Sequence, residues 1–256
     1  MHDEIIEELK KLEVKHSIKI LYAVESGSRA WGFASKDSDW DVRFIYVHVQ
    51  DWYLSIDERK ENIEFILPND IDLSGWELRK ALKLFRKSNP PLFEWLISPI
   101  VYYQQTSFVE QARTLSSTYF NPKSCMYHYL SMAVNNYKDY LQQDMVKVKK
   151  YFYVLRPLLA CAWVEKNEKM PPMEFEINLN NVVENGELKN AINQLLSRKK
   201  EGEELDKEPK IEILNNYIVD RIDYFSKYLK EFSFEPKISN YELNLLFRSV
   251  LKQAWS

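Results

Sequence analysis

The sequence predicts an α+β fold, with a β-sheet and helices in residues 1–105 and an all-helical region in residues 106–256. Four short apolar runs in the first part have the length of strands. These runs lie at 18–24, 40–49, 63–67 and 100–103. From about residue 106 the apolar residues recur at helical spacing instead. We therefore expect two domains, 1–105 and 106–256.

Composition excludes several classes of protein. With 256 residues, 45% hydrophobic and 29% charged, the chain is neither disordered nor fibrous and is long enough to bury a core. The formal charge is −3, from 35 basic and 38 acidic residues. A nucleic-acid binder with an overall basic field is therefore excluded, and any surface for a polyanion must be local.

Cysteine usage and hydropathy predict a cytoplasmic location. Cys125 and Cys161 have neither zinc-site nor disulfide-framework spacing, so we expect two buried free thiols. No apolar run approaches the ~20 residues that span a bilayer, and the acidic start does not resemble a signal peptide. We expect no membrane contact.

The first elements follow from periodicity. Residues 3–16 alternate Ile and Leu with charged residues at helical spacing, which predicts an amphipathic helix. The strand 18–24 ends before Gly27, where a turn is expected. The strand 40–49 is almost continuously apolar, so we expect it to be buried on both faces.

The rest of the first domain contains further strands and helices. Residues 51–61 are polar and predict a loop or short helix, and 63–67 predicts a strand. Ser74 and Glu77 match a capping box, so a helix is expected to begin at Ser74 and to end at Asn89-Pro90-Pro91. A short aromatic-rich segment then leads to the strand 100–103.

The second domain is predicted as a series of helices. We expect them at 106–118, 123–142, 145–166, 187–200, 210–231 and 239–254. Pro157 should kink the third of these helices. Residues 201–209 are highly charged and predict a mobile linker.

Two acids on one predicted strand indicate a metal site. Because strand side chains alternate between faces, Asp39, Asp41 and Arg43 should point together. Paired carboxylates repel each other unless a cation lies between them, and hard oxygen ligands suit Mg²⁺ or Mn²⁺. Asp72, flanked by aliphatic residues, could complete the cluster from a neighbouring strand, although a lone acid there also fits a cap or a surface residue.

Two further segments could bind phosphate. Backbone N–H groups of the Gly27-Ser28 turn can cradle phosphate oxygens, with Arg29 as a neighbouring cation, although Gly-Ser alone is a common turn. In the helix expected at 145–166, basic and aromatic residues interleave in a pattern that suits a triphosphate or a stacked base and equally a solvated face. Its basic residues include Lys147, Lys150 and Arg156.

Taken together, these motifs resemble the signature of the DNA polymerase β nucleotidyltransferase superfamily. The signature consists of Gly27-Ser28, the string Asp39-Trp40-Asp41-Val42 after ten intervening residues, and Ile71-Asp72-Leu73. The longer string from Gly27 to Tyr46 is similar to the RNA-repair-associated (RNA-ligase-associated) nucleotidyltransferases. The strings Asp-Leu-Ser-Gly-Trp-Glu-Leu-Arg-Lys-Ala-Leu and Ser-Asn-Pro-Pro-Leu-Phe-Glu-Trp-Leu support that match, which covers most of the chain.

The resemblance implies a fold and an activity. Residues 1–105 would form the catalytic domain around a mixed sheet, and the enzyme would transfer a nucleoside monophosphate from an NTP to a hydroxyl, with an RNA end as one candidate acceptor. Asp39 and Asp41 would bind two Mg²⁺ or Mn²⁺ ions, Asp72 would share the ion that activates the hydroxyl, and Gly27-Ser28 would hold the outer phosphates. Arg29, Lys147, Lys150 and Arg156 are weaker candidates for phosphate contacts, chosen for their charge and setting.

Two rival functions remain open at this stage. One is a catalytically silent nucleotide-sensing or RNA-binding protein that kept the fold, and the presence of all three acids argues against it. The other is the minimal nucleotidyltransferase of a two-component toxin system, which the large helical region disfavours. The sequence does not indicate the base, the acceptor or the assembly state.

Overall fold

The computed structural model describes residues 1–67, 69–203, 205–235 and 239–256. The chain divides into two compact units, here named the sheet unit and the helical unit. The sheet unit comprises the described residues of Met1–Ala30, Ser38–Tyr119 and Lys237–Ser256, and the helical unit those of Trp31–Asp37 and Phe120–Pro236. This division differs from the predicted boundary between residues 105 and 106, because the helix after that boundary and the end of the chain group with the sheet.

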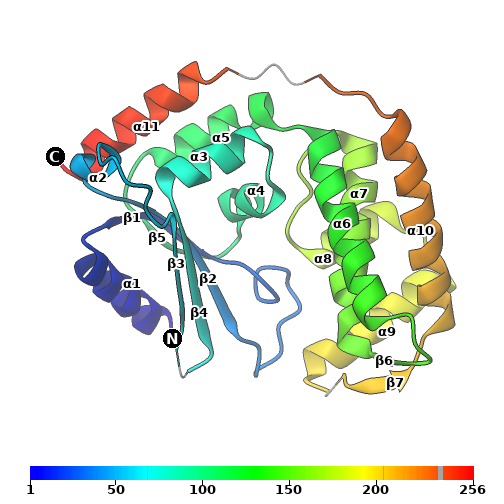
Figure 1. The fold of residues 1–256 in the computed structure, drawn as a ribbon. Helices are drawn as coiled ribbons and strands as arrows, with labels where there is room; N and C mark the ends of the chain where they lie inside the picture. The colour runs from blue at the N-terminus through cyan, green and yellow to red at the C-terminus, as the bar shows by residue number, and fades with distance from the viewer. Residues whose placement is uncertain (68, 204, 236–238) are drawn as a thin grey trace. The chain divides into compact units, whose positions relative to one another are not determined.

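The fold is α+β with a mixed sheet, as the family resemblance implies (Figure 1). Its strands are β1 (Lys19–Glu25), β2 (Trp40–Val47), β3 (Asn62–Ile66), β4 (Ile71–Glu77) and β5 (Val101–Gln104), in the order β3-β4-β2-β1-β5. Strands β2 and β4 are parallel, while the other neighbours are antiparallel. Only the second half of β2 is continuously buried, so the prediction that both faces of this strand are covered is wrong for its first half.

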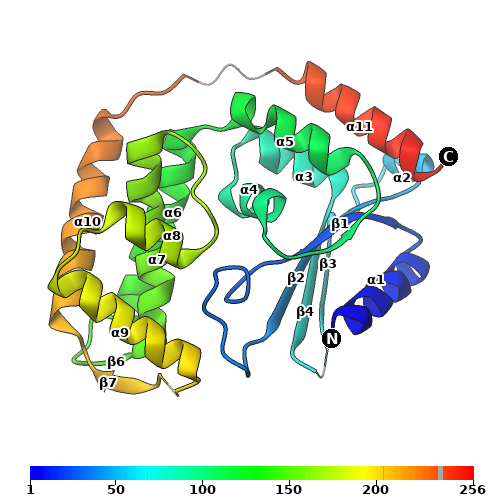
Figure 2. The ribbon, with the colours of Figure 1, turned by 180° about the vertical axis from the view of Figure 1, so that it is seen from behind.

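Helices cover both faces of the sheet unit (Figures 1 and 2). The helices of the sheet unit are α1 (His2–His16), α2 (Gln50–Tyr53), α3 (Leu78–Arg86), α4 (Pro90–Ile97), α5 (Phe108–Tyr119) and α11 (Tyr241–Ala254). Helix α1 buries Ile5, Leu9 and Leu12 against the face that carries Val42 and Leu73. On the opposite face Trp76 stacks on Trp95 of α4, with ring centroids 3.9 Å apart.

The start of α3 corrects the predicted capping box. Ser74 lies inside strand β4, and the helix begins only after Glu77, whose carboxylate accepts the N–H groups of Arg79 (2.8 Å) and Lys80 (3.1 Å). The pairing of β4 with two neighbouring strands extends the strand through the residues whose local pattern favours a helix start.

The proline pair after α3 begins a helix as well as ending one. Asn89 is the N-cap of α4, and its side-chain oxygen accepts the N–H of Leu92 at 3.3 Å. Pro90 occupies the first turn, where a missing N–H leaves no intrahelical hydrogen bond unmade. The aromatic-rich segment before β5 is therefore helical.

The helical unit is built around α7, which packs against α6, α8 and α10. Its elements are α6 (Pro122–Tyr140), β6 (Met145–Lys147), the 3₁₀-helix η1 (Val148–Lys150), α7 (Tyr151–Asn167), α8 (Phe175–Val182), α9 (Glu187–Glu201), β7 (Lys207–Pro209) and α10 (Glu212–Glu231). Phe33 packs into this core, with its ring 4.8 Å from Phe152 and 5.6 Å from Phe175. Cys125 and Cys161 are buried and free, as predicted.

Two predictions for the helical unit are wrong, and one helix was not predicted. The helix expected at 145–166 begins at Tyr151, because residues 145–147 form β6 and pair with β7. The described part of the charged segment 201–209 contains that second strand and the buried Leu205, so it is not an unstructured linker. Helix α8 has no counterpart among the predicted helices.

Within the described ranges, no helix combines the length and the apolar character needed to cross a membrane.

Candidate functional site

Strand pairing brings two of the predicted acids together. Asp41 of β2 and Asp72 of β4 are direct partners in the parallel register, so their side chains leave the same face of the sheet. Ile45 and Trp76 are partners further along this face, where Trp76 meets α4. One end of the face is therefore covered by a helix, and the acids lie at the other end.

Arg43 joins the two carboxylates. Its Nη2 donates to Asp41 Oδ1 at 3.0 Å and to Asp72 Oδ2 at 2.9 Å, and its Nη1 donates to the carbonyl oxygens of Val42 and Asp72. The side chains of Asp41 and Asp72 keep 29% and 37% of their surface exposed, so solvent reaches both acids. The prediction that Asp41 and Arg43 share a face is confirmed.

The pKa of Asp41 reflects its burial first and the charges around it second. Burial raises the pKa of Asp41 above its ordinary value, and the carboxylates of Asp72 and Asp39 raise it further, while Arg43 acts in the opposite direction. A site in which like charges raise a carboxyl pKa favours additional positive charge.

The Gly27 turn lies directly against Asp41. The N–H of Ser26 donates to the carbonyl of Asp41 at 2.7 Å, and Gly27 has a φ of +119°. A Cβ placed on Gly27 would lie 2.0 Å from Asp41 Oδ2. Any side chain at position 27 would therefore collide with the carboxylate, and glycine allows the turn and the acid to touch.

Asp39 is placed differently from the other two acids. It is exposed and precedes β2, and its carbonyl oxygen accepts Arg29 Nε at 3.3 Å. Its charge still contributes to the raised pKa of Asp41. Among the residues that the structure describes, no three His, Cys, Asp or Glu side chains are gathered closely enough to hold a metal ion. The predicted cluster of three acids is therefore present only as the pair Asp41 and Asp72.

The donors of this pair nevertheless fit a hard divalent cation. Carboxylate oxygens are the ligands that Mg²⁺ and Mn²⁺ prefer. The guanidinium of Arg43 already places positive charge against one oxygen of each acid. The pair thus has the chemistry of a cation site, with Arg43 as its internal counter-ion.

Arg29 contacts the residues that lead into β2. Its Nη2 donates to the carbonyl of Ser38 at 2.6 Å, and its guanidinium carbon lies 3.7 Å from the ring centroid of Trp40. These contacts connect the turn after β1 to the start of β2. Its predicted phosphate contact stays a prediction.

The other predicted phosphate ligands belong to the helical unit and do not share one helix face. Lys147 is exposed on β6, and Lys150 in η1 lies 4.3 Å from the ring centroid of Tyr140 and 4.5 Å from that of Tyr153. Burial and the charges of neighbouring lysines lower the pKa of Lys150. Arg156 is buried, 4.3 Å from the ring centroid of Trp31. Their phosphate contacts also stay predictions.

Sequence reasoning missed Glu25, the last residue of β1. Its side chain is fully buried, and its Oε1 accepts the N–H of Asp41 at 2.9 Å. The signal available in the sequence was a lone acid at the end of an apolar strand, two residues before Gly27.

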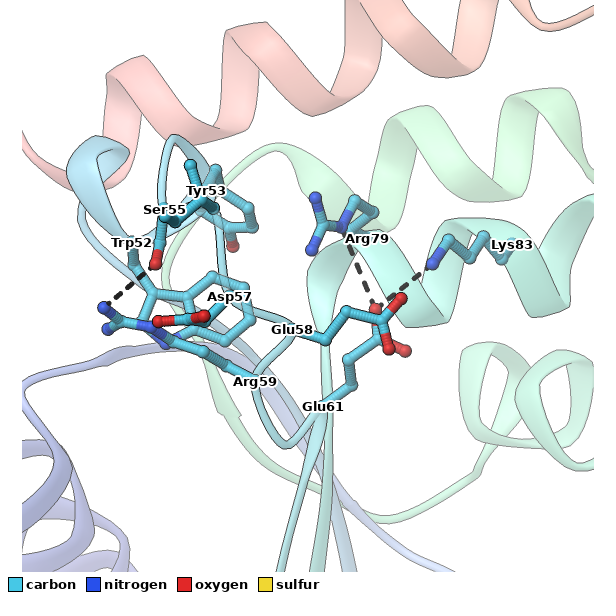
Figure 3. A pocket seen from close by; sticks show the side chains of 10 residues that line it. Trp52, Tyr53, Ser55, Asp57, Glu58, Arg59, Glu61, Arg79 and Lys83 are labelled. Atoms are coloured by element: carbon cyan, nitrogen blue, oxygen red, sulfur yellow. Dashed lines mark hydrogen bonds and ion pairs between the residues drawn. The ribbon is translucent and has the colours of Figure 1, made fainter.

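Two cavities of the sheet unit bear on where the candidate site lies. One of about 510 Å³ is lined by Asp72 of the acid pair and by Arg43, Glu64, Phe65, Ile66 and Ser74. Another of about 410 Å³ is formed by residues of 52–61 with Arg79 and Lys83 (Figure 3). In Figure 3 both cations point toward Glu61, with nitrogens 3.8 Å and 3.2 Å from its Oε1. None of the three predicted acids lines this second cavity, so we place the candidate site at the first.

Comparison with known proteins identifies a matching family and a similar protein. The model of the RNA repair pathway DNA polymerase beta family matches residues 1–249. The uncharacterized protein YcgL of Bacillus subtilis (strain 168) is 50% identical over 255 residues, which covers 100% of this chain and 98% of that protein.

A nucleotidyltransferase-like protein from Exiguobacterium sibiricum 255-15, known from a crystal structure, aligns over 96% of this chain and 88% of its own at 10% identity. Its TM-score of 0.31 is too low to bear on the fold. The family match over nearly the whole chain supports a function of the nucleotidyltransferase type. The chain thus belongs to the RNA repair pathway DNA polymerase beta family.

Proposed function

We propose that this protein transfers a nucleoside monophosphate from an NTP to a hydroxyl group, with an RNA end as the leading candidate acceptor. The acceptor oxygen would attack the α-phosphorus and lose its proton, the bond from that phosphorus to the β-phosphate oxygen would break, and pyrophosphate would leave. The observation that carries the proposal is the pairing of Asp41 with Asp72 directly beside the Gly27 turn.

Each residue has a proposed role in this reaction. Asp41 and Asp72 would hold Mg²⁺ or Mn²⁺, with the exposed Asp39 as a further candidate ligand, and the backbone of Gly27-Ser28 would bind the outer phosphates. When bound, the cations would neutralise phosphate charge and favour loss of the acceptor proton. Arg29, Lys147, Lys150 and Arg156 are candidates for further phosphate contacts. Family membership favours nucleotide and RNA as partners.

The test is transfer of label from each of the four α-³²P-NTPs to short RNA, tRNA and protein, with Mg²⁺, Mn²⁺ or EDTA. We expect metal-dependent labelling of one acceptor class, and Asp41→Asn should reduce it at least about 100-fold. Asp70→Asn is the matched control, because Asp70 is an exposed acid with a φ of 60°, a conformation that asparagine tolerates.

The results separate the proposal from its alternative. Labelling that persists in EDTA or in Asp41→Asn would contradict the assigned site. Nucleotide binding without labelling of any acceptor would instead favour a catalytically silent nucleotide sensor.

A further inference from the structure

Glu25 is a carboxylate buried at the base of the candidate site. Its side chain has 0% exposure. Asp41 N–H donates to one carboxylate oxygen at 2.9 Å, and the Tyr102 hydroxyl donates to the other at 2.5 Å. Burying a carboxylate is unfavourable unless its oxygens accept hydrogen bonds, so these two donors account for its presence in the core.

The backbone of Glu25 also makes hydrogen bonds on both its N–H and its carbonyl side. Its N–H donates to the carbonyl of Ile100 at 3.0 Å, and its own carbonyl accepts the hydroxyl of Ser98 at 2.6 Å. The carboxylate therefore extends from a fixed point beside the segment between α4 and β5.

Residues 25 and 26 together hold the backbone of Asp41 on both sides. The Glu25 carboxylate accepts the N–H of Asp41, and the Ser26 N–H donates to its carbonyl. This holds Asp41 at the point where its carboxylate touches Gly27 and shares Arg43 with Asp72. An apolar residue at position 25 would remove the acceptor and free the N–H side of Asp41.

We propose that Glu25 is a positioning residue that fixes the backbone of Asp41, so that the Asp41 carboxylate stays between the Gly27 turn and Asp72 when a divalent cation binds. This inference rests on the proposed function, because it takes Asp41 as a cation ligand. Glu25 itself does not touch substrate or cation.

The experiment measures binding of Mn²⁺ alone to the full chain, from the EPR signal of free Mn²⁺, together with thermal unfolding. Glu25→Met fills a similar volume without an oxygen acceptor and should weaken Mn²⁺ binding about 10–100-fold. Glu25→Gln keeps an acceptor for the Asp41 N–H and should bind within about threefold of the wild type.

Tyr102→Phe is the matched control, because it removes the other hydrogen bond of the same buried carboxylate. It should lower the melting temperature and leave Mn²⁺ affinity within about threefold of the wild type. If Tyr102→Phe weakens Mn²⁺ binding as much as Glu25→Met, the loss reflects general loosening and the proposal is wrong.

Wild-type affinity in folded Glu25→Met would also overturn the proposal. Should Glu25→Met not fold, Glu25→Asp decides, because it keeps the charge but withdraws the acceptor by one methylene. It should weaken Mn²⁺ binding about 10-fold, and unchanged affinity would overturn the proposal.

Asp41→Asn separates this inference from the proposed function. If the wild type does not bind Mn²⁺, or if Asp41→Asn binds it equally well, the cation site itself is wrong and the role of Glu25 falls with it. If the wild type binds Mn²⁺, Asp41→Asn does not, and Glu25→Met binds normally, only the role of Glu25 is wrong.

Discussion

At the scale of single residues, Gly27 carries the tightest constraint near the acids. Its φ of +119° already disfavours a side chain, and the Asp41 carboxylate occupies the space that a Cβ would need. The Gly-Ser motif therefore has a physical reason in this structure. The absence of a side chain brings the turn into contact with Asp41.

We predict that Gly27→Ala lowers the free energy of unfolding by about 2–4 kcal/mol and displaces Asp41, because left-handed strain and a steric clash add together. Gly32→Ala shares the positive φ, 81°, but its Cβ would meet no atom of the described residues within 4 Å, so it should lose only about 1–2 kcal/mol. Urea unfolding and Mn²⁺ binding of both variants check this. Equal effects on Mn²⁺ binding would contradict the contact with Asp41.

The position of Asp39 shows where the rule of alternating strand side chains stops applying. Alternation places residues 39, 41 and 43 on one face only while the strand continues, and β2 begins at Trp40. Asp39 therefore lies outside the strand, where its direction depends on the loop that Arg29 braces. Asp41 and Arg43, both inside the strand, follow the prediction.

At the scale of elements, the junction of β4 and α3 depends on a carboxylate that the local pattern assigned to a different role. Glu77 is fully buried, caps α3 and accepts the hydroxyl of Tyr53 from α2 at 2.5 Å. Burial raises the pKa of Glu77 above its ordinary value. Ser74, the expected cap, lines the cavity beside Asp72 instead.

We predict that Glu77→Ala lowers the free energy of unfolding by about 2–4 kcal/mol, because α3 loses its cap and the Tyr53 hydroxyl loses its acceptor. Ser74→Ala should change it by no more than about 0.5 kcal/mol. Urea unfolding monitored by circular dichroism checks both. A larger loss of unfolding free energy in Ser74→Ala than in Glu77→Ala would instead support the predicted capping box.

At the scale of the whole chain, the last helix, α11, belongs to the sheet unit. Helix α11 packs against α3 and α5, and Phe247 meets the ring of Tyr53 edge-on at 5.0 Å. The Tyr119 hydroxyl also donates to Glu242 at 3.0 Å. In the sequence, most of the helical unit thus lies between two segments of the sheet unit.

We predict that Leu246→Ala, at a buried position of α11, costs about 2–4 kcal/mol and exposes amides of α3 and α5 to hydrogen exchange. Leu245→Ala is the matched control, because Leu245 is the neighbouring residue and is 45% exposed. Exchange measured by mass spectrometry would show the pattern. Loss of protection confined to residues 120–235 would contradict the placement of α11.

Local patterns were sufficient for the α+β class, for most elements, and for naming Asp41, Asp72 and Gly27. Apolar runs, alternation and turn residues act over a few positions, so they can be read without knowing what packs against them. For the same reason Lys147 and Lys150 were wrongly assigned to the α-helix that contains Arg156. Their helical spacing was visible, but the pairing of β6 with the distant β7 was not.

Contacts between distant segments decided the rest. The parallel pairing of β2 with β4 makes Asp72 the neighbour of Asp41, and the approach of β1 makes Glu25 the acceptor for its N–H. The packing of α11 in the sheet unit is also decided by contacts between segments that are distant in the sequence. Burial and hydrogen-bond partners depend on which segments meet across the fold, and short-range periodicity contains no information about that pairing.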